Sequence, residues 1–355
     1  MRLVLFGDGE SPHLLKWARA LAPQLELWAA SSRGFLPGFD AVLPPERRLA
    51  LHTRPRAAGG NAALLLELPR LALWLRRVRP DWVHAHYLTS HGTLAWLALT
   101  LCGVPGRLVG SAWGSDVLVT PQRSAWQRRL LRRVLRACTL CTSDSQHMAG
   151  RMRELGAGEL MCFPFGLETL PPRPPAKDDM LFFANRGLEP IYAPQRVLDC
   201  FAAIVRDWPQ ARLVVANDGS LQGALQAQAR HLGLLDQVRF VGRLDAQAQA
   251  EHYAQARWYL SLPRSDSVSV SVLEAMAHGC VPLLSDLPAN RELVRDADNG
   301  LILADGATPA PAALHALQQR ARAIARANHD WVREHAMFAP HVQAFVARLH
   351  ELQLR

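Results

Sequence analysis

Residues 265–286 read SDSVSVSVLEAMAHGCVPLLSD, and this stretch contains a loop, a short helix and a strand in succession. The helical pattern covers about residues 270–277, and Gly279 is the kind of residue that ends a helix. The apolar run 281–285 that follows is typical of a buried strand. A helix that leads straight into a buried strand is the repeating unit of a parallel α/β sheet.

The same alternation extends in both directions along the chain. Short apolar runs separated by helical patterns occur at 3–6, 82–85, 108–111, 140–143, 180–184, 212–216, 238–241 and 258–262. Five prolines between Pro164 and Pro175 interrupt the series. We therefore expect two doubly wound, Rossmann-like α/β domains with parallel sheets that face a ligand-binding cleft. The predicted boundaries are a first domain at 1–170, a proline-rich linker at 171–179 and a second domain at 180–335. A C-terminal helix at 336–355 is expected to pack back on the first domain.

Composition and charge exclude several classes of protein. The chain has 355 residues, of which 49% are hydrophobic and 20% are charged, as in a folded globular protein. It has no apolar run of the roughly 18 residues that a membrane span needs, no signal-peptide pattern, and too few cysteines for a disulfide framework. Residues 1–165 contain 21 lysines and arginines against 11 acidic residues, a net charge of +10, whereas residues 166–355 carry −1. The first half is therefore expected to meet an anionic partner.

One helical segment concentrates this positive charge. Its arginines, interleaved with Trp126 and leucines, are Arg123, Arg128, Arg129, Arg132, Arg133 and Arg136. A basic amphipathic helix suits an anionic membrane surface, although a merely solvated face is the default interpretation. No reading motif for nucleic acid accompanies it. The nearby Cys138 and Cys141 have redox spacing, but their apolar strand favours buried thiols.

Within the opening stretch, Asp266 lies in the loop and Glu274 lies in the helix. The first backbone N–H groups of a helix lack internal acceptors and readily bind phosphate, and a carboxylate one turn further along can bind a ribose diol. An alternative interpretation needs no ligand, because Ser271-x-x-Glu274 also fits a capping box. The local pattern does not decide between the two.

The stretch resembles the signature of the family 4 glycosyltransferases, which is a carboxylate, seven residues, and then Glu-Ala-Met-Ala-x-Gly. Asp266 occupies the position at which most members have Glu, as in a variant branch. The resemblance implies the two-domain GT-B fold and a retaining, metal-independent reaction of a nucleotide-diphosphate sugar. It also implies that Glu274 binds the donor ribose, that Asp266 faces the donor sugar, and that the intervening backbone meets sugar and diphosphate. That backbone comprises Ser267, Val268, Ser269, Val270 and Ser271.

The resemblance extends over nearly the whole chain. Arg186 matches the arginine that neutralises the donor diphosphate, while Tyr192 falls near the position of the family's lysine. Arg243 lies in a loop that resembles the family's base-pocket loop. In the first half, the strand that ends His84-Ala85-His86 resembles one whose second histidine approaches the donor sugar. The expected acceptor-side residues are Gly9, Ser11 and Asp116.

Other chemistries fit these residues less well. The Gly7-Asp8-Gly9 turn lacks the third glycine of a dinucleotide fingerprint, because Pro12 occupies its place. The histidine pair lacks the further ligands of a zinc site.

We therefore expect a hexosyltransferase that needs no cofactor and takes its sugar from a nucleotide-diphosphate donor. The acceptor would be a saccharide or a lipid-linked molecule in polysaccharide, lipopolysaccharide or glycolipid biosynthesis. The expected location is cytoplasmic, peripheral on the inner face of the membrane, without a nucleic-acid partner. A catalytically silent sugar-nucleotide-binding partner and a GT-B epimerase remain as alternatives.

Overall fold

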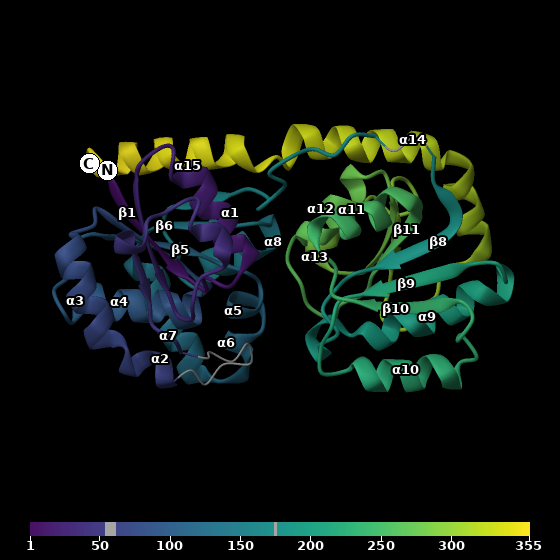
Figure 1. Cartoon of the computed structure of the whole chain (residues 1–355), viewed down its shortest axis with the longest axis horizontal. Coiled ribbons are helices and arrows are strands. Elements are labelled where there is room, and N and C mark those ends of the chain that lie inside the picture. The colour runs from purple at the N-terminus through teal and green to yellow at the C-terminus, as the bar shows by residue number, and fades with distance from the viewer. Residues whose placement is uncertain (54–61, 174–175) are drawn as a thin grey trace. The chain divides into compact units, whose positions relative to one another are not determined.

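The computed structural model describes residues 1–53, 62–173 and 176–355, and the chain divides into two compact units. The N-terminal unit comprises 1–163 and 338–355, and the C-terminal unit comprises 164–337. Figure 1 shows each unit as a sheet between layers of helices. Most of the expected linker at 171–179 lies within the C-terminal unit, where Arg173 pairs with Asp330. Pro174 and Pro175 lie outside the described residues.

The N-terminal unit is built on a parallel sheet in the order β3-β2-β1-β4-β5-β6-β7. The strands are β1 (Arg2–Gly7), β2 (Glu26–Ser31), β3 (Arg48–Ala50), β4 (Trp82–His86), β5 (Arg107–Ser111), β6 (Cys138–Ser143) and β7 (Leu160–Cys162). The strand order reverses between β1 and β4, and in doubly wound sheets ligands bind beyond the carboxyl ends of the strands at such a switch point. β1 ends at Gly7, where the Gly7–Gly9 turn begins, and β4 ends at His86.

Helices cover both faces of this sheet. They are α1 (Pro12–Leu21), α2 (Ala62–Leu66), α3 (Leu68–Val78), α4 (Thr93–Thr100), α5 (Ser115–Leu118), α6 (Thr120–Arg123), α7 (Ala125–Ala137), α8 (Gln146–Glu154) and α15 (Phe338–Gln353). Val83 and Ala85 of β4 face a core formed with α3, α4, α7 and α8. Because side chains alternate across a strand, His84 and His86 face the opposite layer.

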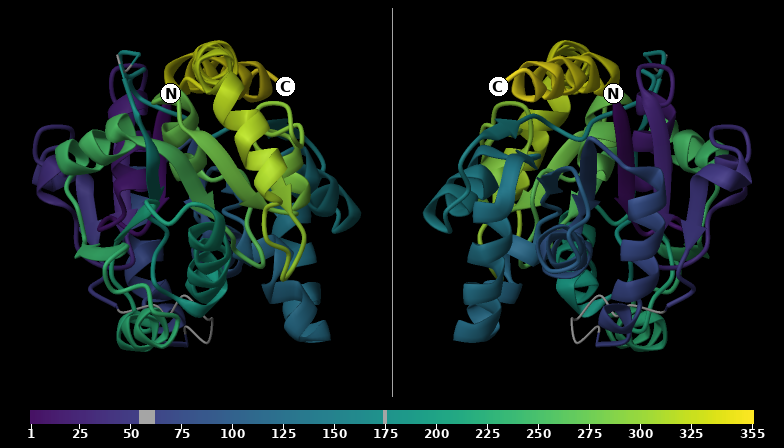
Figure 2. Two further views of the ribbon diagram at one scale, coloured as in Figure 1. Left: turned by 90° about the vertical axis from the view of Figure 1, so that its right-hand side faces the viewer. Right: turned by 90° about the vertical axis from the view of Figure 1, so that its left-hand side faces the viewer.

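The last helix, α15, completes that opposite layer. The Trp17 ring of α1 contacts Phe338 and Phe345 of α15 edge-on, with centroid distances of 5.0 and 5.4 Å. Arg348 pairs with Glu159 at 2.7 Å. Both chain termini consequently lie on the α15 side of this unit (Figures 1 and 2).

The C-terminal unit has a parallel sheet in the order β10-β9-β8-β11-β12-β13. Its strands are β8 (Asp178–Ala184), β9 (Arg212–Ala216), β10 (Val238–Gly242), β11 (Ala256–Ser261), β12 (Val281–Ser285) and β13 (Leu301–Leu303). The order reverses between β8 and β11. Arg186 follows the end of β8, and the loop to Asp266 follows the end of β11, so this switch point places the two residues at one edge of the sheet.

The helices of the C-terminal unit also form two layers. They are α9 (Pro194–Asp207), α10 (Gln222–His231), α11 (Ala246–Gln255), α12 (Val270–Ala277), α13 (Pro288–Arg291) and α14 (Pro311–His335). The first half of α14 packs with α9 and α10 on one face of the sheet, over Phe182, Leu213 and Trp258. Helices α11 and α12 cover the other face, over Phe183 and Tyr259.

The predicted parallel α/β architecture is confirmed, with differences in detail. The strands β2, β3, β7 and β13 were not predicted, because they are short or, as in Glu26–Ser31, mix alanines with polar residues. Helices α2 and α3 follow each other closely but are separate, since Pro69 suits only the first turn of a helix. No helix among the described residues is long and apolar enough to cross a membrane. All six cysteines are unpaired thiols, and Cys138 and Cys141 are buried.

Candidate functional site

The start of α12 lies at the switch point of the C-terminal sheet. The helix begins at Val270 with Ser269 as its N-cap, and the Ser269 side chain makes no capping hydrogen bond. The alternative capping box is therefore wrong, because Ser271 is inside the helix and its hydroxyl contacts other side chains. The first backbone N–H groups of α12 are left without the cap that the serines could have provided.

Arg186 reaches this helix start from the end of β8. Its guanidinium pairs with Asp266 at 2.6 Å between Nη2 and Oδ2, and Nη1 donates to the hydroxyls of Ser269 and Ser271. The buried Nε has no hydrogen-bond acceptor among the described residues. The structure thus brings together three of the residues that the sequence assigned to the donor, Arg186, Asp266 and Ser269.

The ion pair is largely shielded from solvent, with side-chain exposures of 19% for Arg186 and 17% for Asp266. Burial raises the pKa of Asp266, and the charge of Arg186 offsets part of that effect. A buried charge that loses its partner is costly, so each residue fixes the position of the other. An incoming anion would replace Asp266 or share the guanidinium with it.

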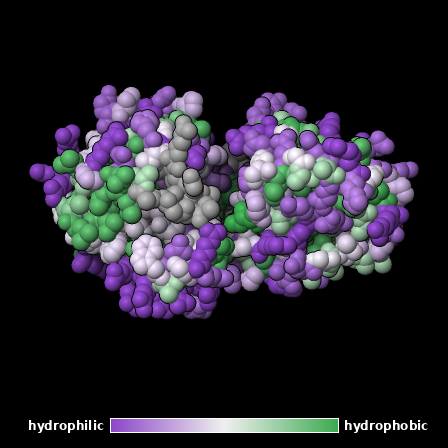
Figure 3. Space-filling view, turned by 90° about the horizontal axis from the view of Figure 1, so that it is seen from below, coloured by the Kyte–Doolittle hydropathy of each residue, from purple (hydrophilic) through white to green (hydrophobic). Residues whose placement is uncertain are grey.

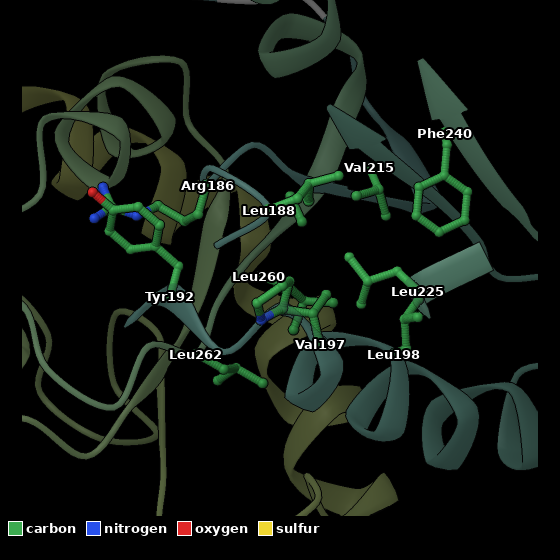
Figure 4. Close-up of a pocket in the computed structure, with 12 residues that line it drawn as sticks. Arg186, Leu188, Tyr192, Val197, Leu198, Val215, Leu225, Phe240, Leu260 and Leu262 are labelled. Carbon is green, nitrogen blue, oxygen red and sulfur yellow. The ribbon is translucent and has the colours of Figure 1, made fainter. Parts of the chain in front are cut away.

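Tyr192 covers the guanidinium from one side. Its ring centroid lies 4.3 Å from the Arg186 Cζ atom, a cation–π contact (Figure 4). Beneath the pair lies a small cavity of about 20 Å³, lined mainly by apolar side chains such as Leu188, Val215 and Phe240. This volume holds about one water molecule, so the cavity is not itself a sugar-nucleotide pocket.

Two buried tyrosines connect the Arg186 end of the site to Glu274. The Tyr259 hydroxyl lies 2.9 Å from Ser271 Oγ and 2.7 Å from Asn185 Oδ1. Asn185 Nδ2 donates to the Tyr253 hydroxyl, which lies 3.1 Å from Glu274 Oε2. Gln249 Nε2 donates to the same carboxylate oxygen at 2.9 Å. Arg186 and Glu274 therefore belong to one hydrogen-bonded network.

The other donor-side residues have different surroundings. Ser267 and Val268 are buried, and the Val268 side chain is part of the core beneath α12. Val270 is half-buried against that core. Arg243 is exposed and pairs with Asp218 at 3.4 Å. The expectation that Arg243 binds the donor stays a prediction.

A second polar cluster lies at the switch point of the N-terminal sheet. The rings of His84 and His86 are 4.4 Å apart, and the edge of Trp17 contacts both. His84 Nε2 lies 2.6 Å from Ser111 Oγ. Burial lowers the pKa of His84 to about 3 and also lowers that of His86, with further effects from neighbouring histidines. Both rings are therefore neutral at physiological pH.

The tautomer of His86 follows from one contact. Trp113 Nε1 is only a donor, and it donates to His86 Nδ1 at 3.1 Å. The ring proton of the neutral imidazole is therefore on Nε2. This buried Nε2 has no hydrogen-bond partner among the described residues, so a donor group is left unsatisfied at the end of β4.

The three acceptor-side residues have clear local roles. Asp116 is buried and accepts hydrogen bonds from the backbone N–H groups of Leu88 and Trp113 at 2.9 and 3.0 Å. Ser11 caps α1 through the N–H of His13. A Cβ at Gly9 would lie 2.4 Å from the carbonyl oxygen of Gly34, so only glycine allows this approach of two loops. Contact of these three with an acceptor stays a prediction.

The described residues contain no group of three or more histidine, cysteine or acidic side chains arranged to hold a metal ion. Asn185, Tyr253, Tyr259 and Gln249 were not among the predicted site residues, because they lie outside the Asp266–Glu274 segment. Composition could have pointed to the two tyrosines, since three of the four tyrosines of the chain, Tyr192 included, lie at this site.

Two family models match the chain in succession. Residues 2–145 match "Glycosyl transferase 4-like", and residues 171–321 match "Glycosyl transferases group 1". The chain belongs to the family 4-like glycosyltransferases. The family membership that the Asp266–Glu274 segment indicated is thus confirmed.

Curated relatives in this family include enzymes of glycolipid synthesis. The alpha-monoglucosyldiacylglycerol synthase of Streptococcus pneumoniae is 30% identical over 102 residues, which are 29% of this chain and 23% of the relative. The phosphatidyl-myo-inositol mannosyltransferase of Mycobacterium tuberculosis is 29% identical over 129 residues, which are 36% and 33% of the two chains. The matched stretches thus span only 23% and 33% of the length of these relatives.

Solved structures establish the fold over the full length. HepE of Anabaena, solved with UDP-glucose, has a TM-score of 0.77 and 15% identity, with 99% of this chain and 100% of that chain covered. Sucrose-phosphate synthase of Thermosynechococcus elongatus has a TM-score of 0.75 and 14% identity, with 99% of each chain covered. The family 4-like chain thus has the GT-B fold.

Proposed function

We propose that the chain transfers a sugar from a nucleotide-diphosphate donor to a saccharide or lipid-linked acceptor, with retention of configuration at the anomeric carbon. The network that joins Arg186, the start of α12 and Glu274 is the observation that carries the proposal. It combines a cation, uncapped helix N–H groups and an oriented carboxylate at one switch point. These are the groups that a diphosphate and a ribose require.

Arg186 and the α12 amides act on the leaving diphosphate. As the bond from the anomeric carbon to the diphosphate oxygen breaks, negative charge builds up on that oxygen. The guanidinium keeps its charge at any physiological pH and is already positioned by Asp266 and Ser269, so it stabilises the charge without reorganisation. In this proposal these groups, rather than a divalent cation, neutralise the leaving group.

Glu274 and His86 act on the uncharged parts of the donor. The contacts from Tyr253 and Gln249 orient the Glu274 carboxylate, which would accept hydrogen bonds from the two ribose hydroxyls. The Nε2–H of His86 would donate to a sugar hydroxyl, and burial keeps that ring neutral. A neutral donor suits this role because sugar hydroxyls carry no charge.

The acceptor side of the proposal rests on the surface of the N-terminal unit. The arginines of α7 are exposed, and Trp126 among them is 68% exposed. Hydrophobic side chains gather on part of the surface of this unit (Figure 3). Among its exposed hydrophobic residues, Leu66 and Leu101 are 81% and 74% exposed. Exposed arginines beside exposed hydrophobic side chains suit an anionic membrane surface. The names of the two relatives given above, a glucosyldiacylglycerol synthase and a phosphatidylinositol mannosyltransferase, also refer to membrane lipids. We propose that the chain works at the cytoplasmic face of a membrane on a lipid-linked acceptor.

An assay of the full chain with UDP-, GDP- and ADP-sugars and membrane extracts tests the proposal. Product formation and nucleoside diphosphate release are followed by mass spectrometry. We expect Glu274→Ala to abolish transfer while its melting temperature stays close to that of the wild type. Wild-type turnover in Glu274→Ala would contradict the assigned site. A wild-type chain that binds a donor but neither transfers nor hydrolyses it would support the silent-partner alternative, and a changed sugar without acceptor would support an epimerase.

A further inference from the structure

A second, larger cavity lies in the C-terminal unit, at the opposite end of the sheet from Arg186. It has a volume of about 510 Å³, and its lining residues belong to the first residues of β8 and β11, the end of α12 and one face of α14. Asp179 at its wall is the second residue of β8, whereas Arg186 follows the last residue of that strand, Ala184. The strand between Asp179 and Ala184 is about 17 Å long. The two sites are therefore separate.

The wall of this cavity is strongly basic. Its basic side chains are Arg173, Lys177, Arg257, Arg322, Arg326 and His329, against Asp179 as the acidic one. Two of the arginines are neutralised inside the protein, since Arg257 pairs with Asp179 at 2.7 Å and Arg173 pairs with Asp330. The uncompensated charge comes from Lys177, Arg322 and Arg326.

Arg322 and Arg326 project into the cavity from successive turns of α14. Both are exposed, and neither forms a hydrogen bond or an ion pair with any residue that the structure describes. Like charges four residues apart repel each other and destabilise a helix slightly. Their side chains start only about 5–6 Å apart, a spacing at which two guanidinium groups can bind neighbouring phosphates bidentately.

Lys177 adds charge from deeper in the wall. Its ammonium donates to the carbonyl oxygens of Tyr253 and Ala256 at 2.6 and 2.8 Å and lies 3.4 Å from Cys280 Sγ. All three acceptors are neutral, so no carboxylate balances this charge. Burial lowers its pKa accordingly. Because its three N–H groups are used, Lys177 acts on an anion through its field rather than by direct contact.

Gly279 allows α14 and Lys177 to approach the end of α12 closely. Its backbone has a φ of +74°, and a Cβ there would lie 3.0 Å from Ala325 Cβ and 3.6 Å from Lys177 Cε. Any side chain would therefore be strained and would crowd α14 beside the arginines. Gln318 and Gln319 complete the helix face with amide groups that suit a polar, uncharged moiety.

We propose that this cavity binds a soluble small molecule with a di- or triphosphate group, such as a nucleotide, at a site distinct from the donor site. The diphosphate portion would bind Arg322 and Arg326, and the volume leaves room for the remainder, since small-molecule sites commonly measure about 300–1,000 Å³. This inference does not depend on the proposed transferase activity, because none of the side chains that line the cavity belongs to the Arg186–Glu274 network.

Calorimetric titration with inorganic pyrophosphate tests the proposal. The titration uses the full chain with Arg186→Gln, so that any diphosphate binding at the donor site is weakened. We expect one remaining site, and an affinity at least tenfold lower when Arg322→Gln and Arg326→Gln are added. The matched control adds Arg206→Gln and Arg230→Gln, which remove the same charge from exposed residues of the same unit that have no ion pair with any described residue. We expect the control to bind like its parent.

Three results would overturn the proposal. The first is absence of pyrophosphate binding in the Arg186→Gln protein. The second is an equal loss of affinity in the control, which would indicate general charge attraction. The third comes from vesicles of phosphatidylcholine with phosphatidylinositol phosphate. If the Arg322/Arg326 variant loses vesicle binding but keeps pyrophosphate binding, the ligand is a lipid headgroup rather than a soluble molecule. Circular dichroism confirms that each variant is folded.

Discussion

The switch points of the two sheets present opposite chemistry. In the C-terminal unit the end of β8 carries a charged network, with Arg186 paired to Asp266 and connected through tyrosines to Glu274. In the N-terminal unit the end of β4 carries neutral, buried histidines surrounded by aromatic rings. The two switch points have a similar topology, but one carries charged side chains and the other carries neutral hydrogen-bond donors. In the proposed function, the charged network binds the anionic diphosphate of the donor and the neutral donor group of His86 binds its uncharged sugar.

The largest expected contrast between the units is their response to acid. Burial lowers the pKa of His84 to about 3 and that of His91 to about 4, and the pKa of His86 is also well below 6.5. The unfolded chain therefore binds up to three more protons than the folded N-terminal unit below pH 6.5, so stability falls as the pH falls. The slope is at most about 4 kcal/mol per pH unit.

Urea unfolding at pH 7.5 and pH 5.5 measures this contrast, with hydrogen-exchange mass spectrometry on peptides that contain β4 and β11. In the C-terminal unit the histidines with lowered pKa, His252 and His278, are less buried, so its stability should fall less. Equal losses in the two units would contradict the neutral, buried state of the N-terminal histidines.

The next largest effect is expected from Arg186→Gln. Removing a preorganised donor from a developing oxyanion lowers turnover by about 10²–10³-fold. The variant should therefore lose this factor in kcat/KM for transfer, measured with the donor that the chain accepts. The control is Arg230→Gln, an exposed arginine on α10. If kcat/KM of Arg186→Gln falls less than threefold, the charged network does not contribute to transfer.

A smaller effect is expected from Glu274→Gln. A hydrogen bond to a charged group contributes about 1.5–3 kcal/mol, so the affinity for the nucleoside diphosphate should fall about 10–100-fold. The loss should shrink when the ribose lacks its 2′-hydroxyl, because the contact is then already absent. Titration calorimetry with the ribo- and 2′-deoxynucleotide measures both. If Glu274→Gln lowers the affinity for the deoxynucleotide as much as for the ribonucleotide, Glu274 does not contact the 2′-hydroxyl and has a structural role instead.

His86 tests the neutral side of the comparison. We expect His86→Phe to lower kcat/KM about tenfold through loss of the Nε2–H donor, and His86→Gln to restore part of it through its amide N–H. Because the pKa of His86 is far below 6.5, the wild-type rate should show no titration of this group between pH 6 and 8. If the wild-type rate changes between pH 6 and 8 and the rate of His86→Gln does not, the His86 ring ionises in this range, which would contradict the account.

Tyr192 is expected to give the smallest effect. A cation–π contact contributes about 0.5–1 kcal/mol at a partly exposed site, so Tyr192→Leu should weaken diphosphate binding about two- to fivefold. Tyr192→Phe keeps the ring and should bind as the wild type does. If both variants lose equally, the hydroxyl rather than the ring face is what matters.

The sequence predicted the parallel sheets well and the site only in part. Periodicity identifies long apolar runs such as 281–285, and the segment from Asp266 to Glu274 pointed to the region that the structure places at the switch point of the C-terminal sheet. The contacts that orient these residues come from Tyr253 and Tyr259, on α11 and β11, and only the folded sheet brings those elements to α12. The ion pair between Arg186 and Asp266 joins residues 80 positions apart, so local pattern could not show it.

The central claim is that Arg186 binds the diphosphate. The most direct test combines two changes, the substitution Arg186→Gln in the protein and removal of the β-phosphate from the ligand. Calorimetry measures the affinities of the nucleoside diphosphate and monophosphate for the wild type and for the variant, with the base that the donor screen selects. We predict that the wild type prefers the diphosphate at least tenfold and that the variant shows almost no preference. If Arg186→Gln keeps the full preference, Arg186 does not hold the diphosphate and the account of this site is wrong.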